Sequence, residues 1–380
     1  NHPPLLFSPD TPTDAGRFAD WSILKKLLVA LIPPVICIIV ATGYASHRIS
    51  AEFLSIALER NVTNITLAQT HEIETLLERC RNDLLFLSRR RLDRDTLMSF
   101  METRAEAFRD SYLELALAGF NHEDQIYLLN TGRDIVDIPI HVTGVMRNSP
   151  LIIPKQAADL LPGDVFLGDL TDVFFPPTAG VNGVANLSMQ VFRLVTPIKH
   201  PNGEPRGFLV LALDAHVVRN LLSLYNSTRS PLFGYSRTAA HRYSVFCDDD
   251  GWMLFQSENV EEPIKDLSVE LARGGLTGDR GKTGYSAAFR PSAQYDPYWR
   301  LISEMKLGKN GLDQVLPELF SLKSTAGDRF LAYAPVRFQG IGNKPQVVVG
   351  GVIYVDETLL PQAAEFSLFN VMLGITIAAM

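Results

Sequence analysis

Cysteine and positive charge are both scarce in this sequence. Its 380 residues include three cysteines and carry a formal net charge of −7. Cys37, Cys80 and Cys247 stand far apart, so they form neither a disulfide framework nor the paired spacing of a zinc site. A single Cys80–Cys247 bridge remains an alternative. A negative balance without a basic patch gives no support to a nucleic-acid partner.

Catalytic motifs are missing as well. The sequence has no Gly-x-Ser-x-Gly nucleophile elbow, no P-loop and no His-Glu-x-x-His pair. The run DDDG (Asp248–Gly251) lacks the alternating ligands and the distal glutamate of a calcium loop, so it predicts a hairpin turn instead. We therefore expect no catalytic site, no metal and no cofactor in this chain. Whether the full-length protein is an enzyme stays open.

A long uncharged segment lies near the N-terminus. Leu27–Ala45, LLVALIPPVICIIVATGYA, is close to the ~20 residues that cross a bilayer. Lys25 and Lys26 precede it, which predicts a cytoplasmic N-terminus. A signal peptide cleaved after Gly43-Tyr44-Ala45 is the alternative. The two prolines inside the segment and the long region before it favour a retained membrane helix.

A second uncharged segment closes the chain. Phe366–Met380 carries no charged residue, and we interpret it as the start of a second membrane helix. The chain begins with Asn1 and ends in this apolar run, so we expect it to be part of a longer protein. The region between the two segments, about 47–362, would then lie outside the cytoplasm.

No glycine or proline occurs between Ser46 and Arg91, which argues against a turn in this stretch. Gln69 is the only polar member of an apolar stripe that predicts a long amphipathic helix leading out of the membrane. The apolar residues recur at intervals of three and four: Leu54, Leu58, Val62, Ile65, Ile73, Leu76, Cys80, Leu84 and Leu87.

After this helix the pattern changes to strands joined by short polar turns. The expected hairpins pair 112–120 with 125–130, 189–200 with 206–214, the two halves of 243–258, and 330–338 with 346–357. Short helices are expected at 155–163 and 215–225. Aligning FRLVTPI…GFLVLALD with FLAYAPV…VGGVIYVD matches a proline and a closing aspartate, Asp214 with Asp356. The order of elements is therefore duplicated within the chain.

Strands with helices segregated to one face predict an α+β fold: two tandem modules with antiparallel sheets on a long N-terminal helix, flanked by transmembrane helices. We call residues 99–235 the first module and 236–362 the second module. The other expected parts are a cytoplasmic tail (1–22), a transmembrane helix (23–46), a stalk helix (47–98) and the start of a second transmembrane helix (363–380).

Two stretches of the first module resemble the double Cache (dCache) sensor region of bacterial transmembrane receptors. VFLGDLTD (165–172) resembles the family's vYiSDi segment, and VFRLVTPIKHPNGEPRGFLVLALDA (191–215) resembles vIRlaTPvfd..G.lrGvlvlNvDa. With the order of membrane helices, stalk helix and modules, the resemblance covers about Leu27–Met380. It implies PAS-like (Cache) modules, of which the first, farther from the membrane, binds a small molecule and the second transmits.

The resemblance also assigns positions. Asp169 matches the aspartate of the first stretch, Arg193 the arginine before Thr-Pro, Gly207 the strand glycine and Asp214 the closing aspartate. Ala212 stands where many relatives carry asparagine. The Arg-x-Trp-Tyr pattern of the amino-acid-sensing subgroup does not occur, which argues against an amino-acid ligand.

Four residues are candidates for ligand binding: Asp169, Arg193, Asp214 and Tyr127. Arg193 could hold a ligand carboxylate with its forked donors. Its alternatives are an ion pair with Asp169 or Asp172, or an outward orientation. Asp169 could accept hydrogen bonds from a ligand, or close a turn.

The other two candidates have structural alternatives of their own. Asp214 could accept from a ligand ammonium, or cap the helix that starts near His216. Tyr127 could form an aromatic wall, or pack in the core.

The sequence thus favours extracytoplasmic small-molecule sensing in a bacterial cytoplasmic (inner) membrane receptor, with residues 47–362 periplasmic or extracellular. The expected partners are a ligand that is an amine or a carboxylate, the membrane, and a second copy joined through the long helix. A two-component sensor histidine kinase is the first expectation for the whole receptor; a diguanylate cyclase or a chemotaxis receptor is the alternative. A membrane-anchored extracytoplasmic protein without signalling output is the alternative of another class.

Overall fold

The computed structural model describes residues 22–108, 111–121, 124–177, 184–200, 203–223, 242–257, 277–313, 330–342 and 344–356. The chain divides into two compact units, Asn1–Ala57 with Leu359–Met380, and Leu58–Thr358. The expected cytoplasmic tail, apart from residue 22, and the expected second membrane helix lie outside the described residues.

In the first unit the described residues belong to helix α2 (Ile23–Ser88) and the residue before it. Lys25–Ser50 is the one described helical segment long and apolar enough to cross a membrane, and its most apolar window is entirely unburied. Pro33 and Pro34 lie inside this helix, where a membrane span tolerates them. That the segment is retained rather than cleaved stays a prediction.

The predicted stalk helix ends earlier than expected. α2 stops at Ser88, and a separate helix, α3 (Arg94–Phe108), follows. The carboxylate of Asp93 accepts a hydrogen bond from the Thr96 amide at 2.9 Å, which caps the new helix. The hydrogen bond from Thr96 also lowers the pKa of Asp93. The break replaces the uninterrupted helix expected over 47–98, because an N-cap residue has non-helical backbone angles and therefore starts a new helix.

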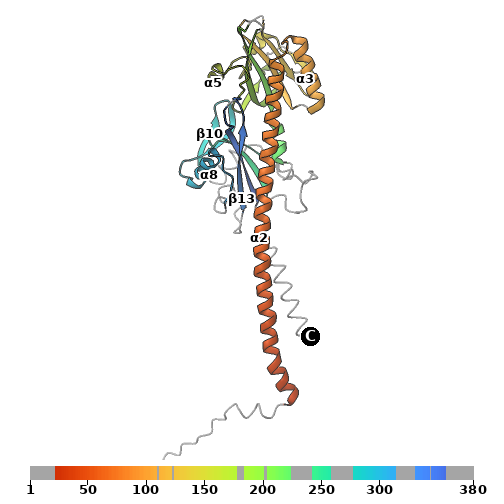
Figure 1. The fold of residues 1–380 in the computed structure, drawn as a ribbon, viewed down its shortest axis with the longest axis vertical. Coiled ribbons are helices and arrows are strands. Elements are labelled where there is room, and N and C mark those ends of the chain that lie inside the picture. Colours follow the sequence, from red (N-terminus) through yellow and green to blue (C-terminus); the bar gives the residue numbers. More distant parts are fainter. Residues whose placement is uncertain are drawn as a thin grey trace, which may run out of the picture. The chain divides into compact units, whose positions relative to one another are not determined.

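The first module contains an antiparallel sheet of seven described strands in the order β3-β2-β1-β7-β6-β4, with β5 also paired to β6. Figure 1 draws this sheet as the yellow and green arrows. Their bounds are β1 Tyr112–Gly119, β2 Ile126–Asn130, β3 Ile135–Asp137, β4 Phe166–Leu167, β5 Thr171–Phe174, β6 Ser188–Lys199 and β7 Pro205–Asp214. Three helices complete it: α4 Ile140–Thr143, α5 Lys155–Ala158 and α6 Ala215–Ser223. The two hairpins predicted here are confirmed.

The second module contains a sheet in the order β10-β11-β9-β8-β14-β13-β12. Its strands are β8 Arg242–Asp248, β9 Met253–Gln256, β10 Gly278–Lys282, β11 Tyr285–Pro291, β12 Gly311–Asp313, β13 Phe330–Phe338 and β14 Val347–Asp356, and its described helix is α8 Asp296–Lys306. Both predicted hairpins are confirmed. Neither α8 nor the β10–β11 hairpin was predicted from the sequence.

The internal duplication is visible in the strand order. The path β2-β1-β7-β6 in the first sheet repeats as β9-β8-β14-β13 in the second. In each case the two strands that were aligned in sequence form a long antiparallel pair. The predicted fold class, two tandem α+β modules with antiparallel sheets on a long N-terminal helix, is confirmed.

One hydrophobic core joins α2 to both modules. It includes Ile73 and Leu84 of α2, Leu211 of β7 and Val352 of β14, all of which are buried. The opposite faces of the two sheets form separate clusters, one in each module. Each sheet therefore uses one face for the shared core and keeps the other for its own.

Gln69, the polar member of the predicted stripe, lies within this junction and is fully buried. Its side-chain amide donates to the carbonyl of Leu222 at 2.7 Å and to Ser244 Oγ at 2.9 Å. Ser244 Oγ also lies 3.0 Å from Gln69 Oε1. The residue thus hydrogen-bonds α2 to α6 of the first module and to β8 of the second.

Candidate functional site

Two of the predicted residues, Arg193 and Tyr127, meet at a third, Glu114. Arg193 Nε donates to Glu114 Oε2 at 2.7 Å, and Arg193 Nη2 donates to Glu114 Oε1 at 3.1 Å. The Tyr127 hydroxyl donates to Glu114 Oε1 at 2.6 Å. Glu114 is completely buried, whereas the Arg193 side chain is 14% exposed. We call these three residues the carboxylate cluster.

Strand pairing explains why the three side chains converge. Ala212 on β7 is the direct partner of both Glu114 on β1 and Arg193 on β6. All three therefore point to the same face of the sheet. The methyl group of Ala212 leaves room for the ion pair to form across the middle strand. At Ala212, where many relatives of the resembled family carry asparagine, the Glu114–Arg193 ion pair therefore passes over a small side chain.

This face of the first sheet is the one turned away from α2. Tyr127 and Ala212 belong to its own hydrophobic cluster, together with Val142 and Phe175 from the long segment between β3 and β6. The rings of Tyr127 and Phe175 stack at a centroid distance of 6.4 Å. The carboxylate cluster is therefore enclosed between the sheet and that segment.

Electrostatics keeps the Tyr127 hydroxyl of the carboxylate cluster protonated. Burial and the adjacent Glu114 carboxylate raise the pKa of Tyr127 well above its usual value, so its hydroxyl stays a donor. A guanidinium has five N–H donors, of which Glu114 takes two. The remaining donors of Arg193 form no hydrogen bond with a described residue and lie on a partly exposed side chain. They are oriented by Glu114 and available to an oxygen acceptor.

Asp214 lies elsewhere, at the end of β7. Its Oδ1 accepts a hydrogen bond from the His216 amide at 2.8 Å, which is the geometry of a helix N-cap for α6. Burial raises the pKa of Asp214, while the His216 amide opposes that effect. The structure thus shows the capping contact that the sequence offered as one alternative; a ligand role for Asp214 stays a prediction.

Asp169 also lies apart from the carboxylate cluster, on the side of the second module. Its carboxylate pairs with Lys282 Nζ at 2.8 Å, and the same ammonium pairs with Asp248 at 2.7 Å. Neither Asp169 nor Asp172 pairs with Arg193. Asp172 instead accepts from the Ser286 amide at 3.1 Å. Both aspartates connect the two modules.

Sequence reasoning missed Glu114 and Lys282. Glu114 was visible as the one charged residue inside the apolar strand YLELALAG, a position that requires a buried partner. Lys282 belongs to a hairpin that was not predicted, so no sequence signal placed it near Asp169.

The remaining expectations concern cysteines and metals. Cys80 and Cys247 are both buried free thiols, so the bridge between them is not formed. Among the described residues no group of three or more potential ligands is placed to hold a metal ion. Asp248 accepts hydrogen bonds from the amides of Asp250 and Trp252, so DDDG forms the predicted turn.

In comparisons with known proteins, no family model and no curated protein matches the chain. Solved structures do match. The periplasmic sensory domain of the Campylobacter jejuni chemoreceptor Tlp1 is 15% identical, with a TM-score of 0.41, and the match covers 80% of this chain and 96% of that domain. The ligand-binding domain of the Pseudomonas aeruginosa PAO1 amino acid chemoreceptor PctC, solved with GABA, is 13% identical, with a TM-score of 0.41 and coverage of 79% and 100%.

The extracellular domain of the putative histidine kinase soHK1S-Z6 is 13% identical, with a TM-score of 0.44 and coverage of 83% and 99%. The matches named here are thus sensory, ligand-binding or extracellular domains. The function proposed below rests on the residues of this chain.

Proposed function

We propose that this chain is the extracytoplasmic sensing region of a membrane-anchored receptor, and that its first module binds a small molecule at the carboxylate cluster. The observation that carries the proposal is the buried Glu114–Arg193 pair. Burying an ion pair costs desolvation energy that an apolar pair would avoid, so it is weak evidence for a purely stabilising role. It does hold a guanidinium in one orientation with donors left over.

The pair also limits the chemistry of the ligand. Glu114 neutralises Arg193, so the cluster offers directed donors without net charge. A ligand oxygen, from a carboxylate or a carbonyl, would accept from the Arg193 donors that Glu114 leaves unused. The apolar neighbours on the same sheet face would contact the rest of the molecule, as in most small-molecule sites.

We propose that α2 carries the signal, because it shares one buried core with both modules. A ligand shifts such a system only if it binds one conformation better than the other. We further propose that two copies associate through α2, and that the output is of the histidine-kinase type, the first of the three output types that the sequence resemblance allows. The full-length receptor would then transfer phosphate from ATP to one of its own histidines.

The experiment is a thermal-shift screen of the full chain in detergent against carboxylates, amines, amino acids and purines. A ligand that binds only the folded state raises the melting temperature by mass action. We expect a hit whose shift is lost in Arg193→Lys, which keeps the charge but not the fork, and retained in Arg147→Lys, an arginine outside the cluster. A shift that survives changing both Arg193 and Asp214 to alanine contradicts the proposed site.

A further inference from the structure

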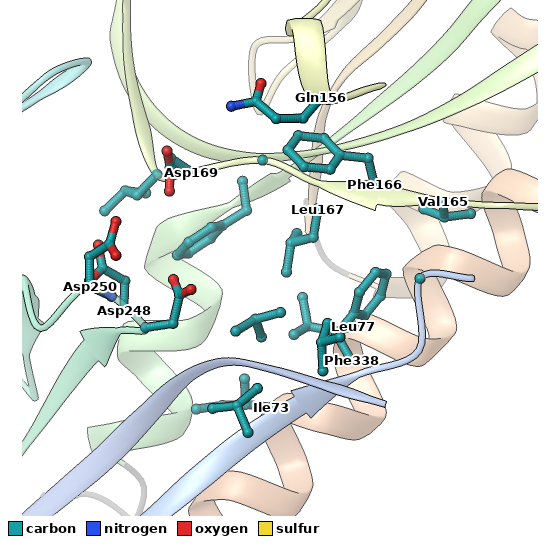
Figure 2. A pocket seen from close by; sticks show the side chains of 18 of the residues that line it. Ile73, Leu77, Gln156, Val165, Phe166, Leu167, Asp169, Asp248, Asp250 and Phe338 are labelled. Atoms are coloured by element: carbon teal, nitrogen blue, oxygen red, sulfur yellow. The ribbon is translucent and has the colours of Figure 1, made fainter. Parts of the chain in front are cut away.

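A cavity lies where the two modules meet α2. It has a volume of about 570 Å³, within the range of small-molecule sites. Its walls come from α2 (Ile73, Leu77), from the first module (Phe166, Leu167) and from the second (Phe338, Val349). In Figure 2, Ile73, Leu77, Phe166, Leu167 and Phe338 lie around one space. A molecule bound here would contact all three parts at once.

This cavity is separate from the carboxylate cluster. Phe192 lines the cavity, whereas its neighbour Arg193 belongs to the cluster. Successive residues of a strand point to opposite faces of the sheet. The cavity therefore lies on the α2 side of the first sheet, and the carboxylate cluster lies on the other side.

Polar contacts between the modules surround the cavity. Lys282 of β10 bridges Asp169 and Asp248. The amide of Val165 donates to the carbonyl of Gly340 at 2.7 Å. These contacts hold the first module to the second. The residues of these contacts that also line the cavity are Asp169, Asp248, Val165 and Gly340.

The two ends of the cavity differ in chemistry. In Figure 2, Asp169, Asp248 and Asp250 lie together at one side, and Leu77 and Phe338 lie away from them. Leu77 and Phe338 are buried, at 4% and 3% exposure. The side chains of Asp169 and Asp250 are 65% and 63% exposed, so the acidic end is the mouth.

The lining itself carries more negative than positive charge. Asp249 joins the three aspartates, which makes four carboxylates, and Lys344 is the one described cation of the lining. Cations outside the lining reach three of the four carboxylates: Lys282 pairs with Asp169 and Asp248, and Lys306 lies 4.0 Å from Asp250. Lys306 and Arg337 share an adjoining depression with Asp249, but neither forms an ion pair with it. An ammonium group in the cavity would give Asp249 a direct partner.

We propose that the cavity binds a small organic cation with an apolar body. Its ammonium group would lie at Asp249 and Asp250 in the mouth, and its apolar part would lie among Leu77, Phe166 and Phe338. The ligand would hold α2 and both modules in one arrangement, and so it would act as a second input beside the ligand of the first module. This inference does not depend on the carboxylate cluster.

The test is isothermal titration calorimetry of the full chain in detergent with two matched probes, 4-phenylbutylamine and 4-phenylbutyrate, against a protein-free detergent blank. They share a skeleton and differ in the charge of the head group. We expect the amine to bind about tenfold more tightly than the acid, the value of one charge-assisted contact. Absence of amine binding, or equal affinity for the two probes, overturns the proposal.

Variants locate the bound probe. Asp249→Asn with Asp250→Asn should weaken amine binding about tenfold, whereas Asp159→Asn with Asp279→Asn, two exposed aspartates off the lining, should not. Leu167→Trp should fill the cavity and abolish binding, with folding checked by the melting temperature. Unchanged affinity in Asp249→Asn with Asp250→Asn overturns the proposal. Loss of amine binding in Arg193→Lys alone would place the probe at the carboxylate cluster and overturn it as well.

Discussion

The two modules share four central strands but differ on the sheet face turned away from α2. In the first module this face contains the buried ion pair of Glu114 and Arg193. In the second module it is covered by α8 and is apolar, with Leu301 and Met305 of α8 packed on the strands. The Tyr298 hydroxyl, a polar group within that cluster, donates to the carbonyl of Gly251 at 2.8 Å.

The two modules thus use the same strand order but differ in the chemistry of the sheet face turned away from α2. An apolar face with a helix packed on it stabilises the module and gives a ligand nothing to recognise. Burial raises the pKa of the Cys247 thiol on this face to about 12, so it stays protonated. A face with a buried ion pair is less stabilising than an apolar one, but it holds a guanidinium in one orientation. This contrast is the reason to look for the proposed ligand in the first module.

The largest expected effect breaks the ion pair. Arg193→Met leaves the fully buried Glu114 carboxylate without its cation, and we expect the opening free energy of amides in β1 and β6 to fall by about 3–5 kcal/mol. Hydrogen–deuterium exchange measures the two sheets separately, so the loss should be confined to the first. In the second module, Tyr298→Phe removes one neutral hydrogen bond and should cost about 1 kcal/mol.

The double variant Glu114→Leu with Arg193→Met is the control. Replacing a buried ion pair by apolar residues is often neutral or stabilising, so protection should return to near the wild-type value. If Arg193→Met alone leaves exchange in β1 and β6 unchanged, the pair contributes nothing to the first sheet. The contrast between the two faces would then have no energetic basis.

A smaller effect concerns Lys282, the ammonium between the modules. Burial raises the pKa of Asp248, and the hydrogen bond from Lys282 opposes the rise. Lys282→Met removes that opposition, and we expect a loss of about 2 kcal/mol at pH 7. An aspartate whose folded pKa lies above its unfolded value loses stability as pH rises toward and through the folded pKa. The loss should therefore shrink as the pH falls through the raised pKa of Asp248, because the protonated carboxyl no longer needs the ammonium.

Melting temperatures of the wild type and the variant between pH 4 and pH 8 measure this difference. Lys306→Met is the matched control, because its ammonium is 4.0 Å from Asp250 and both side chains are about half exposed or more. Such a pair is worth under about 1 kcal/mol. A pH-independent difference for Lys282→Met would show that Lys282 acts through packing and not through Asp248.

The sequence predicted the strand pairs better than the helix ends and the side-chain contacts. Strand pairs with strong alternation and short turns, such as β6 with β7, were placed within a residue or two because neighbours in sequence pair in space. The end of α2 was missed because Asp93 sits inside a helical pattern and looks like a polar surface residue. α8 was missed although Asp296–Lys306 has an acidic residue and a proline in its first turn, both signals of a helix start.

In the candidate site, the sequence likewise identified individual residues but not their partners. Arg193 and Tyr127 were selected from sequence, but their partner Glu114 lies on a strand distant in sequence from Arg193. No local sequence pattern predicts which carboxylate pairs with the Arg193 guanidinium across the strand that carries Ala212. Asp169 was given two local alternatives, and its observed partner, Lys282, lies in the other module. Long-range pairing of charges is what a single sequence leaves undetermined.

The smallest expected effect sharpens the comparison of the two closing aspartates. Asp214 caps α6, whereas the residues after Asp356 lie outside the described part of the chain. Asp214→Ala should lower the protection of α6 amides by about 1 kcal/mol, and Asp214→Asn by a few tenths, because asparagine caps nearly as well. Hydrogen exchange of the peptide covering 215–223 makes the measurement.

The same pair of variants separates capping from ligand binding. If Asp214 only caps, Asp214→Asn keeps both the protection of α6 and the thermal shift given by a ligand of the first module. If its carboxylate also binds the ligand, Asp214→Asn keeps the helix but loses the shift, since a neutral amide cannot replace the charge toward an ammonium. Equal loss of helix protection in both variants would contradict the capping role, because only the alanine removes the acceptor oxygen.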